Sequence, residues 1–162
     1  MPFKPVPRLK RFSYTGLYRY SLTICILNRR RLFVDRDAVD IVLAKLVHTA
    51  RQYQFAVIAY CFMPDHLHLL VEGTSSEARL ADFVRAFKQL SSYEWKRKFG
   101  NKLWQRSYFE HVLRENESPV KAARYLLGNP LRARMVARIE DYPFLGSLTM
   151  PLLDLLYSVA VD

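Results

Sequence analysis

The chain has 162 residues and contains few of the cysteine, glycine and proline residues on which several protein classes depend. Its two cysteines, Cys25 and Cys61, lie in apolar runs and are too few for a disulfide framework or a thiolate metal site, so we expect buried thiols in strands. Only 5 Gly and 8 Pro are present, which excludes a collagen-like, low-complexity or wholly disordered chain. The length and the 51% of hydrophobic residues predict one globular domain.

The sequence also lacks the segments that carry a chain into or across a membrane. No run approaches the roughly 20 apolar residues that a spanning helix needs. The basic residues near the start precede no apolar signal region, and neither end has an amphipathic helix with aromatic residues and a lysine-rich face. We therefore expect a cytoplasmic protein with no membrane partner.

Lysine and arginine are absent after Arg138, although the chain has 25 of them against 15 acidic residues and a formal net charge of +10. A basic body with an acidic tail favours a polyanionic partner such as nucleic acid, and the alternative is a basic protein from a basic proteome. Basic groups occur in an N-terminal arm (residues 1–11, which include Lys4), after the first expected strand and on the expected helices. The candidate phosphate-binding residues are Arg8, Lys10, Arg11, Arg29, Arg30, Arg31, Arg85, Lys88 and Lys121.

Hydrophobic periodicity predicts the order of the elements. Helices are expected from Asp35, from a capping box at Thr74 and Glu77, and from Ser118, the last of them ending at Asn129 and Pro130. The order β-α-β-β-α-β predicts an α+β, ferredoxin-like sandwich with an antiparallel sheet. Two helices would cover one face, and the C-terminal helix would lie over the open face. Strands are expected over residues 18–27, 55–63, 66–72 and 108–113.

Two histidines lie two positions apart in one expected strand. Side chains alternate between the faces of a strand, so His66 and His68 point the same way, about 6–7 Å apart, while Leu67 and Leu69 point to the opposite face. Two imidazoles side by side can share one metal ion. The alternative is a pair of structural histidines, each with its own hydrogen-bond partner.

A tyrosine lies off the apolar stripe of the last expected helix. Tyr125 falls almost opposite Ala123 and Leu127 on a helical projection, and Asn129 follows one turn later on the same face, with Lys121 beside it. Hydroxyl, amide and ammonium groups could then converge on one place. The alternative is a surface tyrosine followed by an ordinary polar helix end before a proline.

Three motifs in this order resemble a known family. Residues 60–71, 104–105 and 125–130 are similar to the single-tyrosine HUH transposases of the bacterial insertion-sequence type, and most similar to their REP-associated tyrosine transposase branch (RAYT). The resemblance covers roughly residues 8–147, so we expect one domain over residues 1–147 and a tail over residues 148–162, which match no motif of the family. It implies that His66 and His68 match the metal-binding pair, that Tyr125 matches the nucleophile, and that Asn129 stands where relatives place a polar helper or third metal ligand.

The resemblance also implies an activity and a partner. Such an enzyme uses a divalent ion, Mg²⁺ or Mn²⁺, to cleave and rejoin single-stranded DNA through a 5′-phosphotyrosine. The implied ligand is hairpin DNA of the repetitive extragenic palindrome (REP) kind, whose bases could stack on aromatic residues such as Tyr14, Tyr18, Trp104 and Tyr108.

Several alternatives remain at the level of sequence. The chain could be a domesticated DNA-binding regulator that keeps the fold without cleaving, or a ferredoxin-like RNA-binding module. An RNA-binding module would show paired aromatic residues on its central strands, where this chain has His66 and His68. Relatives of the insertion-sequence type act as dimers that exchange the tyrosine, whereas the RAYT branch is monomeric, and the sequence does not choose between these states. The tail could dock as a helix or occupy the DNA groove.

Overall fold

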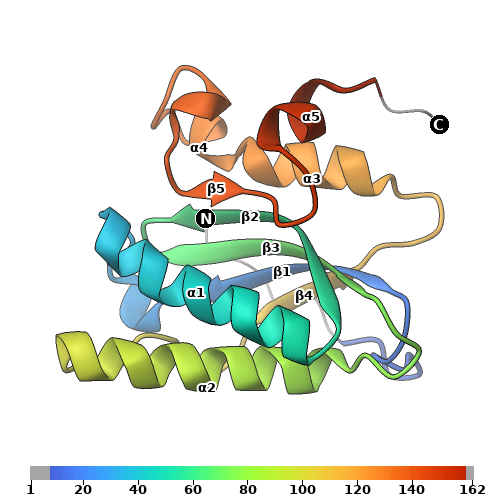
Figure 1. Cartoon of the computed structure of the whole chain (residues 1–162), viewed down its shortest axis with the longest axis horizontal. Helices are drawn as coiled ribbons and strands as arrows, with labels where there is room; N and C mark the ends of the chain where they lie inside the picture. Colours follow the sequence, from blue (N-terminus) through green and yellow to red (C-terminus); the bar gives the residue numbers. More distant parts are fainter. Residues whose placement is uncertain (1–7, 160–162) are drawn as a thin grey trace.

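The computed structural model describes residues 8–159, which form a five-stranded antiparallel sheet between two layers of helices (Figure 1). The strand order is β4-β1-β3-β2-β5, which confirms the expected α+β, ferredoxin-like sandwich and adds a short edge strand. The strands are β1 (Arg19–Cys25), β2 (Phe55–Met63), β3 (His66–Gly73), β4 (Phe109–Val112) and β5 (Leu145–Gly146). The helices are α1 (Arg36–Gln52), α2 (Leu80–Phe99), α3 (Pro119–Leu127), α4 (Asn129–Arg132) and α5 (Leu152–Tyr157), with short 3₁₀ helices η1 (Leu27–Arg29) and η2 (Ile139–Asp141).

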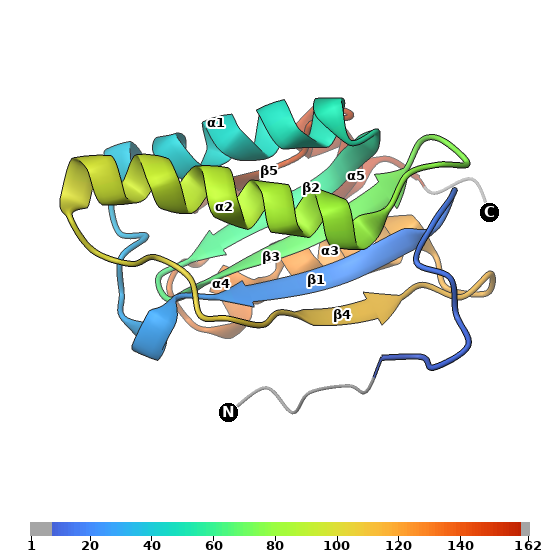
Figure 2. The ribbon, with the colours of Figure 1, turned by 90° about the horizontal axis from the view of Figure 1, so that it is seen from below.

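Helices α1 and α2 cover one face of the sheet (Figures 1 and 2). The Asp35 side chain accepts a hydrogen bond from the backbone N–H of Ala38 and so caps the start of α1. The apolar stripe of α1 is buried at Val42 and Leu46, and it packs in the same core as Leu67 and Leu69 of β3. The alternation of β3 therefore directs its leucines to this core and leaves its histidines for the other face.

Helix α3 lies over the other face, as expected, and α5 packs beside it (Figure 1). Cys61 and Leu70 from the sheet form a second buried cluster with Ala123, Leu127 and, from the tail, Leu155. Because α3 sits over β2 and β3, it brings its own polar side next to the part of this face formed by β1 and β4.

The start of α2 differs from the expectation. No capping box forms at Thr74, because its hydroxyl donates a hydrogen bond to the Gln54 carbonyl (2.9 Å). The helix begins at Leu80, whose N–H donates to the Tyr14 carbonyl (3.1 Å), and residues 74–79 make a turn and a bridge to the N-terminal segment. Long-range pairing thus replaces the local cap that the sequence favours.

The C-terminal part of the chain is also more structured than expected. Ser118 caps α3 and Pro119 occupies its first turn, as predicted, but α3 ends at Leu127, and Asn129 and Pro130 begin α4 instead of ending a helix. The tail docks as α5. The two cysteines are buried free thiols in β1 and β2, as expected. Within residues 8–159 no helix has the length and apolar character needed to cross a bilayer.

Candidate active site

The two histidines of β3 face each other at the start of the strand. Cys25 of β1 and Met63 of β2 flank His66 in register, and His68 lies between Thr23 and Cys61. The Nε2 atoms of His66 and His68 are 2.9 Å apart, and their rings are nearly perpendicular. The period of the strand, together with one rotamer choice per ring, thus brings two nitrogen donors to one point.

Each histidine uses its other ring nitrogen to contact a neighbouring polar side chain. Nδ1 of His66 lies 2.6 Å from a carboxylate oxygen of Asp65, and Nδ1 of His68 lies 3.1 Å from the hydroxyl oxygen of Thr23. A proton on Nδ1 of His66, donated to the Asp65 carboxylate, leaves the lone pair on Nε2, which is the arrangement that metal-binding histidines adopt. Nε of Arg29 donates a hydrogen bond to the other carboxylate oxygen of Asp65, at 2.9 Å.

Burial keeps both imidazoles neutral. It lowers the pKa of His66, against the opposing effect of Asp65, and together with the neighbouring His66 it lowers the pKa of His68 to about 3. Burial acts to raise the pKa of Asp65, but hydrogen bonds from His66 and Arg29 outweigh it and lower that pKa overall. At neutral pH the pair therefore consists of two uncharged donors next to an ionised carboxylate, which suits it to hold a cation.

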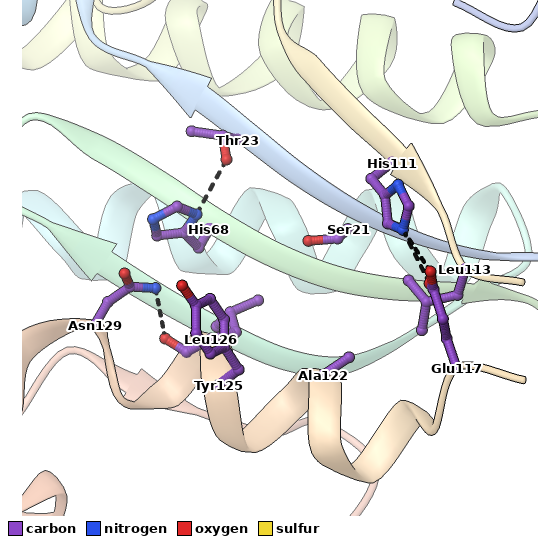
Figure 3. A pocket seen from close by; sticks show the side chains of 10 residues that line it. All are labelled: Ser21, Thr23, His68, His111, Leu113, Glu117, Ala122, Tyr125, Leu126 and Asn129. Atoms are coloured by element: carbon purple, nitrogen blue, oxygen red, sulfur yellow. Dashed lines mark hydrogen bonds and ion pairs between the residues drawn. The ribbon is translucent and has the colours of Figure 1, made fainter. Parts of the chain in front are cut away.

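Tyr125 and Asn129 share a cavity with His68. The cavity has a volume of about 390 Å³ and lies between the sheet and α3. Residues of β1, β3, β4, α3, the loop before α3 and the start of α4 line it. Tyr125 is 69% exposed, and Figure 3 shows its hydroxyl on the side of α3 that faces His68. The Asn129 amide donates to the Leu126 carbonyl (2.8 Å). The phenol and the histidine pair therefore lie on the same side of the sheet, in one chain.

Residues 8–159 contain no group of three or more His, Cys, Asp or Glu side chains placed to hold a metal ion. Asn129 and Tyr125 line the cavity together with His68, so their amide and hydroxyl groups belong to the same cavity as one of the two histidines. A divalent ion at this point would therefore have two nitrogen ligands from β3 and an amide from the start of α4, with its other positions left for water or a substrate.

Arg132 holds Tyr125 in place and was not identified from the sequence. Its guanidinium carbon lies 3.9 Å from the centre of the Tyr125 ring, and one of its nitrogens donates to the Tyr125 carbonyl at 2.6 Å. A β-carbon on Gly128 would come within 2.8 Å of the other terminal nitrogen, so the absence of a side chain at Gly128 makes room for this stack. The sequence signal that could have identified this contact is the spacing: Arg132 follows Tyr125 by seven residues, with Gly128 between them.

A second pair, also missed in the sequence, lies at the other end of the cavity. His111 of β4 contacts both carboxylate oxygens of Glu117, at 2.9 and 3.2 Å (Figure 3). The N–H of Arg114 donates to the same carboxylate. His111 is the largest cause of the lowered pKa of Glu117. The contact ties the loop before α3 to the edge strand, so it helps to fix where α3 begins.

Many of the expected phosphate-binding residues already have protein partners. Lys88 donates to the carbonyls of residues 105–107 at 2.8, 3.0 and 3.3 Å, which uses all three of its donors. Arg30 donates to the Leu27 and Lys102 carbonyls. The arginines paired with carboxylates are Arg8 with Glu110, Arg29 with Asp65 and Arg85 with Asp82. These side chains therefore act within the fold, and Lys88 in particular positions the segment before β4.

Lys10, Arg11, Arg31 and Lys121 are exposed on the surface. Lys4 and the rest of residues 1–7 lie outside the described residues. Of the aromatic residues expected to stack on bases, Trp104 is only 7% exposed and donates to the Ser91 hydroxyl, so it belongs mainly to the core.

Known proteins are similar to this chain in sequence and in fold. Residues 14–126 match the family described as "Transposase IS200 like". A Haemophilus influenzae protein described as a REP-associated tyrosine transposase is 25% identical over 144 residues, covering 82% of this chain and 80% of the relative. The ISDra2 transposase TnpA of Deinococcus radiodurans is 30% identical over 120 residues, covering 69% of this chain and 84% of the relative.

The fold is similar to that of a solved REP-associated tyrosine transposase bound to a REP hairpin, with a TM-score of 0.70 at 18% identity, covering 86% of this chain and 82% of that one. The family match includes both histidines of β3 and Tyr125 of α3. His68 and Tyr125 line one cavity here, and His66 contacts His68. This chain belongs to the IS200-like transposase family.

Proposed function

We propose that this chain is a metal-dependent tyrosine transposase that binds hairpin-forming single-stranded DNA and cleaves and rejoins it through Tyr125. The observation that carries the proposal is the meeting of His68, Tyr125 and Asn129 at one cavity, with Nε2 of His66 2.9 Å from that of His68. The solved relative bound to a REP hairpin supports a hairpin of that kind as the DNA partner.

The residues present fit a divalent ion. Two neighbouring ligands of an octahedral ion, each about 2.1 Å from it, lie about 3 Å apart. This matches the 2.9 Å between the two Nε2 atoms. His66 and His68 would hold the ion with Asn129 as a third ligand; imidazole donors favour Mn²⁺, whereas Mg²⁺ prefers oxygen. When bound, the ion would polarise the scissile phosphate and offset its charge.

The proposed step exchanges one bond at phosphorus. The Tyr125 oxygen forms a bond to phosphorus, the bond from phosphorus to the 3′ oxygen breaks, the phenol proton passes to solvent, and the departing 3′ oxygen takes up a proton. The products are a 5′-phosphotyrosine and a free 3′-OH. Because the phosphodiester bond energy is retained, attack by another 3′-OH rejoins the strand by the reverse exchange without ATP.

The geometry supports a site completed within one chain. Tyr125 lines a cavity with His68 of its own chain, so a monomer has every proposed group, and a homodimer would have to exchange α3 to use them in trans. Since the curated relatives are bacterial, we expect the protein to act in the cytoplasm, where the chromosome lies.

Formation of a covalent adduct tests the proposal. The protein is incubated with Mn²⁺ and labelled single-stranded hairpin oligonucleotides of REP type, and the products are separated on a denaturing gel. We expect wild type to give a labelled protein band, which Tyr125→Phe, His66→Ala and EDTA each abolish, because they remove the nucleophile, a metal ligand and the ion.

Tyr157→Phe is the matched control, since Tyr157 is exposed to a similar degree, 64%, and lies outside the cavity. It should keep the adduct. An adduct that survives Tyr125→Phe would contradict the assigned nucleophile. Tight binding of hairpins with no adduct in any metal would instead indicate a DNA-binding regulator on this fold.

A further inference from the structure

A second cavity lies beside the end of β1 and is separate from the cavity of the candidate active site. Its volume is about 620 Å³, and it is formed by the C-terminal half of α2, the segment that leads from α2 to β4, and Leu27 of η1. Figure 2 shows that this segment passes beside the end of β1. The lining residues are Leu27, Gln89, Ser92, Tyr93, Lys96, Lys102, Leu103, Trp104 and Arg106.

The cavity is positively charged. Lys96, Lys102 and Arg106 line it, and no acidic residue among residues 8–159 does so. None of the ion pairs found among residues 8–159 includes these three side chains, whereas Arg97, one position along α2, lies 3.6 Å from Glu94. The positive charge of the cavity is therefore not offset within the described chain, and it complements an anion.

An aromatic ring stands exposed among these cations. Tyr93 is 62% exposed, while Trp104 in the same cavity is nearly buried. The guanidinium carbon of Arg97 lies 6.0 Å from the centre of the Tyr93 ring, so a cation already lies near the ring. Leu27 and Leu103 add apolar surface, and Gln89 and Ser92 add hydrogen-bonding groups. An open ring surrounded by cations matches the two needs of an unpaired nucleotide, a stacking surface for the base and positive charge for its phosphates.

The backbone connects this cavity to the histidine pair. Leu27 lies two residues beyond Cys25, the register partner of His66, and its N–H donates to the Leu103 carbonyl at 2.8 Å. Arg30 bridges the Leu27 and Lys102 carbonyls. A DNA strand that leaves the candidate active site past His66 and Arg29 would therefore meet this cavity next.

We propose that the α2 cavity binds an unpaired nucleotide of the single strand that flanks the DNA hairpin, with its base on Tyr93 and its phosphates on Lys96, Lys102 and Arg106. This subsite rests on the proposed function, because it extends the DNA path from the cavity of Tyr125. It would recognise a flank of any sequence, since stacking and charge are sequence-tolerant.

Binding is measured with Tyr125→Phe protein, so that cleavage does not interfere. The probes are a hairpin without flanks and hairpins with single-stranded 5′ or 3′ flanks of increasing length. We expect Tyr93→Ala to weaken the binding of one flanked series by about 5-fold or more, the size of one lost base stack, and to leave the unflanked hairpin unchanged. Tyr93→Phe keeps the ring and should bind as the parent.

The salt dependence supplies a second readout. Replacing Lys96, Lys102 and Arg106 with Gln should reduce the slope of log affinity against log salt by about 2 for the flanked probe, since each single-strand phosphate contact contributes about 0.7. Lys98→Gln, on the same helix but outside the cavity and paired with Asp37, is the control. An iodouracil placed along the flank should crosslink to Tyr93.

Equal loss of flanked and unflanked binding, or no loss in either, would overturn the subsite. So would tight binding of an acidic peptide that the flank does not displace. Failure of the proposed function has a different signature: wild type would form no adduct with any hairpin, although the flank still crosslinks to Tyr93.

Discussion

Asp65 and Thr23 determine how the two histidines present their nitrogens. Each contacts one Nδ1 atom, at 2.6 and 3.1 Å, so that the two Nε2 atoms are directed to a common point. Without these contacts each imidazole could rotate or change tautomer, and the pair would lose its fixed geometry. Side chains next to the histidines are therefore as much a part of the site as the histidines themselves.

Arg132 plays the corresponding part for Tyr125, the proposed nucleophile. Because its guanidinium stacks on Tyr125 and bonds the Tyr125 carbonyl, we expect Arg132→Ala to let the phenol move away from the cavity. The single-turnover rate of adduct formation should fall by about 10- to 100-fold, the cost of misplacing a reacting group by about 1 Å. Hairpin affinity should change by less than about 3-fold, because Arg132 acts through Tyr125.

Two variants separate positioning from charge. Arg132→Lys keeps the charge but loses the planar group, so it should stay slow. Added guanidinium should partly restore the rate of Arg132→Ala, and urea should not. If Arg132→Ala lost hairpin affinity and rate together, or if Arg132→Lys were fully active, the positioning role would be wrong.

At the scale of elements, the position of α3 depends on the segments on either side of it. Its apolar residues Ala123 and Leu127 pack on β2 and β3, and Arg124 donates to the Leu155 carbonyl (2.9 Å) and to the Ser158 carbonyl of the tail. The tail is thus part of the support for α3. It docks against the side of α3 away from the cavity residues, none of which belongs to α5.

The packing of α5 gives a direct prediction about stability. Leu155 is 1% exposed within the second core, so Leu155→Ala should leave a cavity and lower the free energy of unfolding by about 2–4 kcal/mol. Leu153 is 58% exposed on the same helix, and Leu153→Ala should change it by less than about 0.5 kcal/mol. Urea unfolding followed by circular dichroism measures both. Equal effects would show that α5 does not pack as described.

At the scale of the whole molecule, every proposed catalytic group comes from one chain. This predicts no complementation when Tyr125→Phe and His66→Ala proteins are mixed, since neither chain has both a nucleophile and an intact histidine pair. The measurement is the covalent adduct, with the two proteins distinguished by size. A wild-type chain mixed with Tyr125→Phe is the positive control, and an adduct on the His66→Ala chain would demonstrate exchange of α3 between subunits.

Much of this architecture followed from local pattern. The period of β3 separated His66 and His68 from Leu67 and Leu69, and Ser118 with Pro119 fixed the start of α3, because alternation and capping depend on neighbours in the chain. The start of α2 did not follow, since Thr74 bonds Gln54 rather than its own helix. The sequence pattern of Thr74 and Glu77 is compatible both with a capping box and with a turn bonded to another segment. The distant partner, Gln54, decides which of the two forms.

The sequence by itself determined the order of the elements, the shared face of the two histidines and the polar side of the helix that carries Tyr125. Tertiary structure alone decided that Arg132 stacks on Tyr125, that Lys88 supports a loop, and that Tyr93 shares a cavity with Lys96, Lys102 and Arg106 beside the end of β1. The reason is physical: periodicity acts over a few residues, whereas the partner of a long charged side chain depends on which segments the fold brings within its reach.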